Sequence, residues 1–141
     1  MTTPTTKATD IKRDWIFLDL KGKVLGRVAS EIAQILLGKN KVNQSDNLDV
    51  GDYIIAVNSD LIAVTGKKLT DKMYYRHSGY PGGFKEESLA SKMAKDSTKV
   101  IELAVKNMLP KNKLQQPRLR RLKVFKDENH PYQSQIKAKT N

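Results

Sequence analysis

The chain of 141 residues contains no cysteine, and this absence excludes several kinds of chemistry. Disulfide bonds, thiolate nucleophiles, iron–sulfur clusters and cysteine-based zinc sites all need that residue. The absence also fits a protein of a reducing compartment such as the cytoplasm. We therefore expect neither a disulfide framework nor thiolate chemistry.

Histidine is almost as scarce, since the chain has only His77 and His130. Neither lies in an H-E-x-x-H pattern, and the G-x-S-x-G turn of serine hydrolases is missing as well. The remaining carboxylates are isolated, so no nucleophile, base and orienting group can be assembled from them. We expect no catalysis, no metal site, no cofactor and no small-molecule substrate.

Long apolar runs are also missing. The longest, Tyr53 to Val57, has the length of a strand, whereas a spanning helix needs about 18 apolar residues. Residues 1–14 hold five threonines and mixed charges, without the apolar stretch of a secretory signal. We expect one domain over residues 15–132, with flexible tails at 1–14 and 133–141.

Positive charge is what the chain has in excess, with 26 Lys and Arg against 15 Asp and Glu and a net charge of +11. A charge of this size opposes compaction and indicates a polyanionic partner. Binding to a membrane surface would need a basic amphipathic helix, which Pro110 and Pro117 would break. We favour nucleic acid over a membrane, with a merely soluble basic protein as the alternative.

Short apolar runs along the chain predict strands. Two of them, Trp15–Leu18 and Tyr53–Val57, are aromatic or β-branched and are typical of buried strands. Further short runs lie at residues 61–64, 72–76 and 122–125.

Helical periodicity is clearest from Leu25 to Leu36, where apolar residues recur at every third or fourth position until Gly38. Residues 89–93 predict a short helix, and residues 100–108 predict a stronger one that ends before Pro110. The alternation of strands and helices predicts a layered α/β domain with a mostly parallel sheet.

A strip of 24 residues, from Leu103 to Lys126, contains no acid. Its two prolines favour an extended path over much of residues 108–118. Cations without neighbouring counterions suit a phosphate backbone, although a solvated basic tail is the alternative. The basic residues of the strip are Lys106, Lys111, Lys113, Arg118, Arg120, Arg121, Lys123 and Lys126.

A second basic cluster surrounds the glycine-rich loop from Ser78 to Gly83. Glycines let backbone N–H groups approach phosphates closely, and Tyr75, Tyr80 or Phe84 can stack on an unpaired base. The alternative is a surface turn whose glycines only supply positive φ. The polar and charged members of the cluster are Lys67, Lys68, Lys72, Arg76, His77 and Lys85.

Two other functions are alternatives to RNA binding. The turn Gly22–Arg27 lies between a predicted strand and a predicted helix, as a nucleotide loop would, but its glycine spacing differs from G-x-G-x-x-G. A DNA-binding module would need a helix with several outward Arg, Lys or Asn side chains near its start, and none is present. A nucleotide-dependent enzyme and a DNA-binding module are therefore the weaker hypotheses.

Several segments, taken in order from about Trp15 to Gln135, resemble the bacterial form of the family named after the thirteenth protein of the large ribosomal subunit. Each segment is weakly diagnostic alone, but their order and spacing are specific. The segments are Trp15 with Asp19, Gly22–Ser30, Gly38–Lys41, Gly51–Asn58, Val64–Lys68, Tyr74–Gly83, Ala104–Asn112 and Leu122–Phe125.

The resemblance implies a three-layer α/β/α fold around a four-stranded, mostly parallel sheet, with extended basic segments over 106–126. It implies binding to large-subunit rRNA beside neighbouring large-subunit proteins, a part in early subunit assembly in the cytoplasm, and no catalysis. The chain departs from the family pattern over residues 42–48 and 113–121, so the path of the chain there stays open. The expected RNA contacts are Lys23, Lys39, Lys41, Lys67, Lys68, Tyr75, Arg76, His77, Ser78, Gly79, Tyr80, Pro81, Gly82, Gly83, Lys85, Lys106, Pro110, Lys111, Asn112, Lys113, Arg118, Arg120, Arg121 and Lys123.

Overall fold

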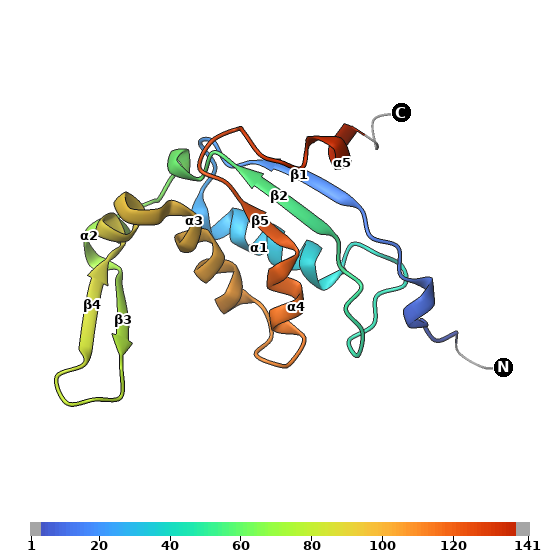
Figure 1. The fold of residues 1–141 in the computed structure, drawn as a ribbon, viewed down its shortest axis with the longest axis horizontal. Helices are drawn as coiled ribbons and strands as arrows, with labels where there is room; N and C mark the ends of the chain where they lie inside the picture. The colour runs from blue at the N-terminus through green and yellow to red at the C-terminus, as the bar shows by residue number, and fades with distance from the viewer. Residues whose placement is uncertain (1–3, 138–141) are drawn as a thin grey trace.

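The fold is that of a computed structural model, which describes residues 4–137. Its central sheet has three parallel strands in the order β1-β2-β5. Strand β2 lies in the middle and is buried from Ile54 to Val57, which explains its nearly continuous apolar sequence. The strands are β1 (Trp15–Asp19), β2 (Tyr53–Val57) and β5 (Leu122–Val124) (Figure 1).

The expectation of a fourth strand in this sheet is wrong. After β2 the backbone of Asn58 turns into the left-handed region, with φ of 60°, and a 3₁₀ turn, η2 (Ser59–Leu61), follows. The apolar run at 61–64 contributes only an isolated parallel bridge, from Ala63 to Val24. The mixed α/β class is confirmed, but the sheet is smaller than expected.

The strand expected at 72–76 exists as β3 (Met73–His77), but it does not join the central sheet. It pairs in antiparallel fashion with β4 (Phe84–Ser88) and forms a separate two-stranded hairpin. Strand β4 was not predicted. The glycine-rich loop Ser78–Gly83 connects the two strands.

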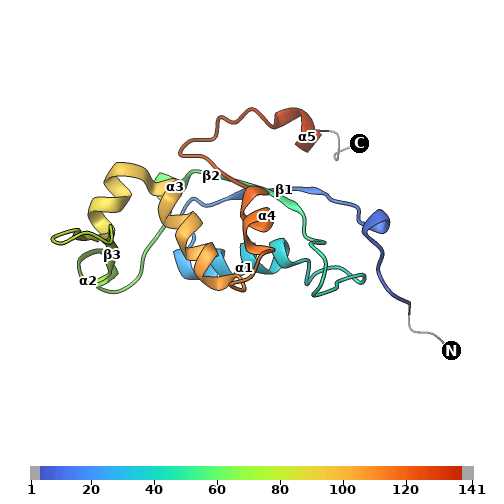
Figure 2. The same ribbon diagram turned by 60° about the horizontal axis from the view of Figure 1, so that its bottom comes forward.

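Two long helices cover one side of the central sheet (Figure 2). Helix α1 (Leu25–Leu37) ends at Gly38, whose φ of 78° lets its N–H bond back to the carbonyls of the last turn. Helix α3 (Leu89–Met108) is interrupted at Asp96, which has non-helical backbone angles. Its two halves correspond to the short and the stronger helix that the sequence predicts.

The opposite side of the sheet is covered by the C-terminal segment and α5 (Gln133–Lys137). An aromatic layer joins the two: the ring of Trp15 stacks on Tyr53 at 4.3 Å and on Tyr132 at 5.3 Å. Residues 133–137 thus begin a helix, where the sequence predicted a tail. The prediction of flexible ends at residues 1–3 and 138–141 lies outside the described residues.

The helices that remain are short: η1 (Ala8–Asp10), α2 (Lys68–Asp71) and α4 (Gln115–Arg120). Within residues 4–137, no helix combines the length and the apolar character needed to cross a membrane.

Candidate nucleic-acid interface

The β3–β4 hairpin projects from one end of the molecule, while α5 lies toward the other end (Figure 1). The hairpin meets the body at its base, where the N–H of Leu89 donates to the carbonyl of Lys72 at 3.0 Å. Leu89 is fully buried, so the first turn of α3 anchors the arm in the core. Its far end is thereby free to contact another molecule.

The glycine-rich loop at the tip has a defined shape. The N–H of Gly83 donates to the carbonyl of Tyr80 at 3.0 Å, and the backbones of Gly79 and Gly82 have φ of 86° and 73°. A Cβ on Gly83 would lie 2.0 Å from the hydroxyl of Ser78. Three of the loop positions therefore favour glycine for conformation or space, as the sequence indicated.

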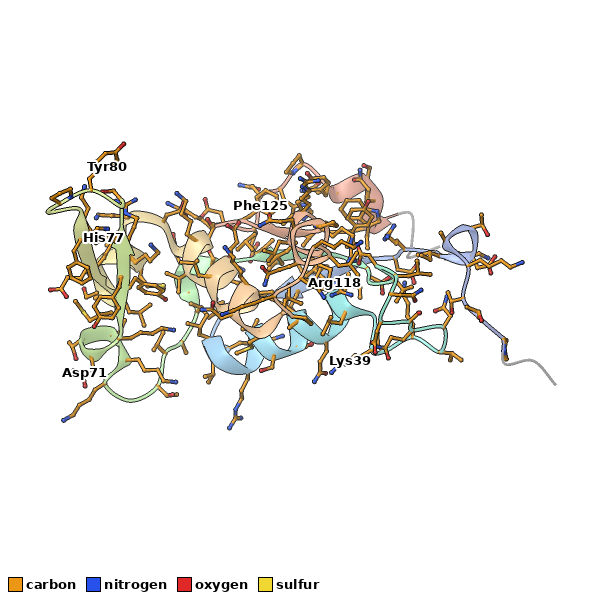
Figure 3. The ribbon with its side chains drawn as sticks, turned by 90° about the horizontal axis from the view of Figure 1, so that it is seen from below. Lys39, Asp71, His77, Tyr80, Arg118 and Phe125 are labelled. Atoms are coloured by element: carbon orange, nitrogen blue, oxygen red, sulfur yellow. The ribbon has the colours of Figure 1, made fainter. Side chains whose placement is uncertain are left out.

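His77 stabilises the same turn, because its Nδ1 accepts a hydrogen bond from the N–H of Gly79 at 2.8 Å. An accepting Nδ1 carries no proton, so the neutral ring has its proton on Nε2, which is left to donate to a ligand. Tyr80 is 75% exposed and points away from the body at the tip of the arm (Figure 3). The loop thus presents an imidazole donor and an aromatic ring to solvent.

The two faces of the hairpin differ, as alternation in an antiparallel pair requires. Tyr74 packs toward the core, with the ammonium groups of Lys72 and Lys92 5.4 and 5.0 Å from its ring centre. Burial raises the pKa of the Tyr74 hydroxyl. Tyr75 lies on the other face, exposed and stacked on Phe84 with 5.8 Å between ring centres. Of the two adjacent tyrosines, one therefore packs on the core and the other faces solvent.

Most of the cations expected to bind RNA are exposed. No exposed member of that set forms an ion pair with another residue of the part of the chain that the structure describes. They lie on the hairpin, on the turn before α2, at both ends of α1 and from the end of α3 to α4. The exposed cations are Lys23, Lys39, Lys67, Lys68, Arg76, Lys85, Lys106, Lys111, Lys113 and Arg120.

The basic strip, however, is not extended throughout. Residues 115–120 form the short helix α4, and the strip begins inside α3. Arg118 and Arg121 turn inward and are only 3% and 5% exposed, and Figure 3 shows Arg118 within the body. The extended path predicted for 115–118 is wrong, and these two guanidinium groups are not on the surface.

The buried Arg121 is held by groups from two distant segments, the end of α1 and the loop before β2. One terminal nitrogen donates to the carbonyl of Asp52 at 2.9 Å, and the other donates to Leu36 at 3.1 Å and pairs with the Asp49 carboxylate. Burial lowers the pKa of the Arg121 guanidinium, and the charge of Asp49 opposes that effect. The Nε of Arg118 lies 3.9 Å from the same carboxylate. The single Asp49 carboxylate thus lies beside both buried cations, and it also pairs with Arg13.

Lys41 is a further cation with an internal partner. Its ammonium lies 2.7 Å from the Asp52 carboxylate and donates to the carbonyls of Lys12 and Val50. These bonds fasten the N-terminal segment and the 39–51 loop to the start of β2. Lys41 therefore has a structural role that the sequence did not reveal. Of the other cations expected to bind RNA, Lys123 on β5 is half-buried.

The turn Gly22–Arg27, considered above as a nucleotide loop, borders an open groove of about 590 Å³ between α1, α2 and α3. Lys67, Lys68 and Lys72 line it. Among residues 4–137, no three His, Cys, Asp or Glu side chains come together in a way that could hold a metal ion.

Asp49, Asp52 and Glu86 were missed by sequence reasoning. The two aspartates lie in a polar loop, and nothing in the local sequence indicates that the Asp49 carboxylate and the Asp52 carbonyl meet Arg121, some 70 residues later. Glu86 gains its position from β4, whose charged sequence does not resemble a strand.

These features define a class of protein, a small basic α/β protein with a projecting aromatic arm and, among the described residues, surface cations that form no internal ion pair. The sequence matches the profile of the family described as ribosomal protein L13 over residues 13–131. The chain belongs to the ribosomal protein L13 family, which confirms the resemblance found in the sequence.

Relatives from several bacteria cover almost the whole chain. The large ribosomal subunit protein uL13 of Dehalococcoides mccartyi is 52% identical over 96% of this chain and 94% of its own length. The proteins of the same name from Alcanivorax borkumensis and Syntrophotalea carbinolica are 48% and 45% identical, over 96% and 100% of this chain and 95% and 99% of their own lengths. Membership of this family of structural ribosomal proteins confirms the prediction that the chain is not an enzyme.

Proposed function

We propose that the chain is a structural component of the large ribosomal subunit that binds large-subunit rRNA and joins the subunit early in its assembly. It would work in the cytoplasm, beside neighbouring large-subunit proteins and without a cofactor or small-molecule substrate. The names of its relatives support the subunit, and the surface described above supports RNA as the ligand.

The observation that carries the proposal is the separation of two kinds of cation. The inward-facing cations Arg118, Arg121 and Lys41 have carboxylates close by, whereas the exposed cations of the hairpin and the 106–120 region have no internal ion pair within residues 4–137. Unpaired surface cations raise self-repulsion and lower stability unless a polyanion neutralises them. RNA phosphates would do so, with release of condensed counterions.

The shape of the protein surface would make its binding specific for particular parts of the rRNA. A-form RNA offers few readable base edges to a protein, so a rigid loop and a fixed surface are suited to recognise its backbone geometry. The hairpin segment from Arg76 to Gly83, with Lys85, and the turn from Pro110 to Lys113 are almost wholly exposed. Lys67, Lys68 and Lys106 add cations around these parts. Arg118 and Arg121 are left out of the proposed contacts because they are buried.

The direct test is filter binding of the purified chain to deproteinised large-subunit rRNA over a range of salt concentrations. We expect saturable binding whose affinity falls steeply with salt, and weaker binding to small-subunit rRNA as the matched control. Equal affinity for the two rRNAs would contradict the specificity that the proposal requires.

A further inference from the structure

The exposed face of the hairpin carries two aromatic rings that are largely open to solvent. Tyr75 is 66% and Phe84 is 55% exposed, and their rings stack with an interplanar angle of 21°. Large aromatic side chains are normally buried, because each can remove a large apolar area from water. A stacked pair held open on a rigid arm is therefore suited to a flat apolar ligand.

A carboxylate lies beside this pair. In the strand register Glu86 is directly opposite Tyr75, and His77 is directly opposite Phe84, so all four side chains share one face. The side chain of Glu86 is exposed, and it forms no hydrogen bond or ion pair with any residue in the described range 4–137. Its neighbour Glu87, on the opposite face, is bound by Lys92 and Lys95 instead. The chain as a whole has a net charge of +11, so a carboxylate without a cationic partner stands out. Next to two open rings it is placed to accept hydrogen bonds from a ligand that lies on them.

Cations lie on the other face of the same strands. Arg76 and Lys85 are directly opposite each other, exposed, and without an ion pair among the described residues. Their long side chains leave them in reach of phosphates that flank a ligand on the aromatic face. A protein partner would need a wider apolar surface than two rings with charged residues on every side. The chemistry of this arm fits a nucleotide.

We propose that this face of the hairpin holds one unpaired RNA base, stacked on Tyr75 and Phe84, whose exocyclic amino group donates to Glu86. The inference rests on the proposed function and deepens it. Guanine, adenine and cytosine carry such an amino group. Uracil presents two carbonyl oxygens beside its single N–H, and these repel a carboxylate that can only accept. The arm would then recognise a non-helical feature of the RNA, in addition to its backbone.

The test uses the full chain and RNA duplexes that are identical except for one bulged nucleotide, G, A, C or U, or none. Fluorescence anisotropy gives the Kd of each. We expect the three amino-bearing bulges to bind about ten-fold more tightly than the fully paired duplex, because the base stacks on the two rings and its amino group donates to Glu86. The U bulge should give up part of that gain, because uracil can stack on the rings but has no amino group to donate to the carboxylate.

Three variants locate the effect. Tyr75→Ala with Phe84→Ala should remove the preference for a bulge, so that bulged and fully paired duplexes bind this variant with about the same Kd. The exchange Tyr75→Phe with Phe84→Tyr keeps both rings and should keep the preference. Glu86→Gln, which can also donate, should bring the U bulge close to the others. Melting curves check that each variant folds.

The outcomes separate this inference from the function on which it rests. If the double alanine variant weakens paired and bulged duplexes by the same factor, or weakens neither, the stacking site is wrong while RNA binding stands. If Glu86→Gln leaves the discrimination against U intact, the carboxylate does not read the base. If the unaltered chain binds neither these duplexes nor large-subunit rRNA, the proposed function itself fails.

Discussion

At the scale of single residues, burial decides what a cation does in this chain. Arg120 and Arg121 are neighbours in the sequence, yet one is exposed and the other is buried against two backbone carbonyls and the Asp49 carboxylate. A charge removed from water needs a partner close by, since its desolvation costs several kcal/mol. Arg121 therefore acts as an internal tie between the loop before β2, the end of α1 and β5.

Removing the counter-charge tests this tie. Asp49→Asn should lower the free energy of unfolding by about 3 kcal/mol, because it leaves two buried guanidinium groups without a carboxylate. Urea unfolding at neutral pH measures the loss. The control is Glu128→Gln, at an exposed position, for which we expect a change below about 0.5 kcal/mol. Similar small effects for both variants would mean that Asp49 does not stabilise the fold.

A second prediction concerns space at Gly51, just before β2. A Cβ there would lie 2.0 Å from the carbonyl oxygen of Leu36 and 2.8 Å from a terminal nitrogen of Arg121. The backbone oxygen cannot move without disturbing α1, so Gly51→Ala should cost about 3 kcal/mol of stability.

The matched control is Gly26→Ala in the first turn of α1, where a Cβ would meet nothing within 4 Å. Alanine has the higher helix propensity, so this change should stabilise the protein by about 0.5 kcal/mol. Thermal unfolding of both variants compares them, and opposite signs are expected. Equal destabilisation would show that the close approach at Gly51 is not the cause.

At the scale of elements, α3 is two helices joined at Asp96. The Asp96 carboxylate accepts hydrogen bonds from the hydroxyl and the N–H of Thr98, at 2.6 and 3.2 Å, and so caps the second half. These bonds, led by the one from the Thr98 side chain, lower the pKa of Asp96 from its ordinary value of 3.8. The break lies between the part of α3 next to the hairpin and the part in the core.

The cap gives a prediction with a defined pH dependence. Asp96→Ala should cost about 1 kcal/mol at pH 7. A lowered pKa in the folded state means that the charged cap stabilises fully above the unfolded value of 3.8 and stops doing so as the pH falls through the folded value.

The cost of Asp96→Ala should therefore shrink between pH 7 and pH 3 in urea unfolding. Asp96→Asn keeps an acceptor without the charge, so it should cost less at pH 7 and change less with pH. A cost for the alanine variant that is the same at both pH values would contradict the role of the charged cap.

Elements with a strong apolar pattern were predictable, and those that depend on distant partners were not. β1, β2, β5 and α1 follow from apolar residues at strand or helix spacing. β4 has the sequence Phe-Lys-Glu-Glu-Ser and is a strand only because β3 lies beside it. The apolar run at 61–64 is not a strand, because the turn at Asn58 directs the chain out of the sheet.

The same limit applies to the candidate site. The exposed loop Arg76–Gly83 could be predicted, since its glycines and tyrosines stand together in the sequence. The burial of Arg118 could not, because its partner Asp49 is separated from it by about half of the chain. Basic residues close together in sequence therefore overstate the cationic surface, and only the fold separates structural from surface charges.

At the scale of the whole molecule, the affinity for RNA should depend on how many exposed cations contact phosphates. Replacing Lys106, Lys111, Lys113 and Arg120 with Gln should weaken binding to large-subunit rRNA. The slope of log K against log salt should become shallower by roughly 0.7–0.9 for each phosphate that the variant no longer neutralises. As the control, exchanging the three lysines for arginine keeps the charge and should keep the slope. An unchanged slope in the Gln variant would remove this region from the interface.

The most direct test of the central claim, that the chain is a structural part of the large ribosomal subunit, is its sedimentation in a cell lysate. Sucrose gradients at low magnesium separate the subunits, and a high-salt wash removes loosely bound proteins. We predict that the chain stays in the large-subunit peak after the wash. A chain found mostly at the top of the gradient would contradict the account.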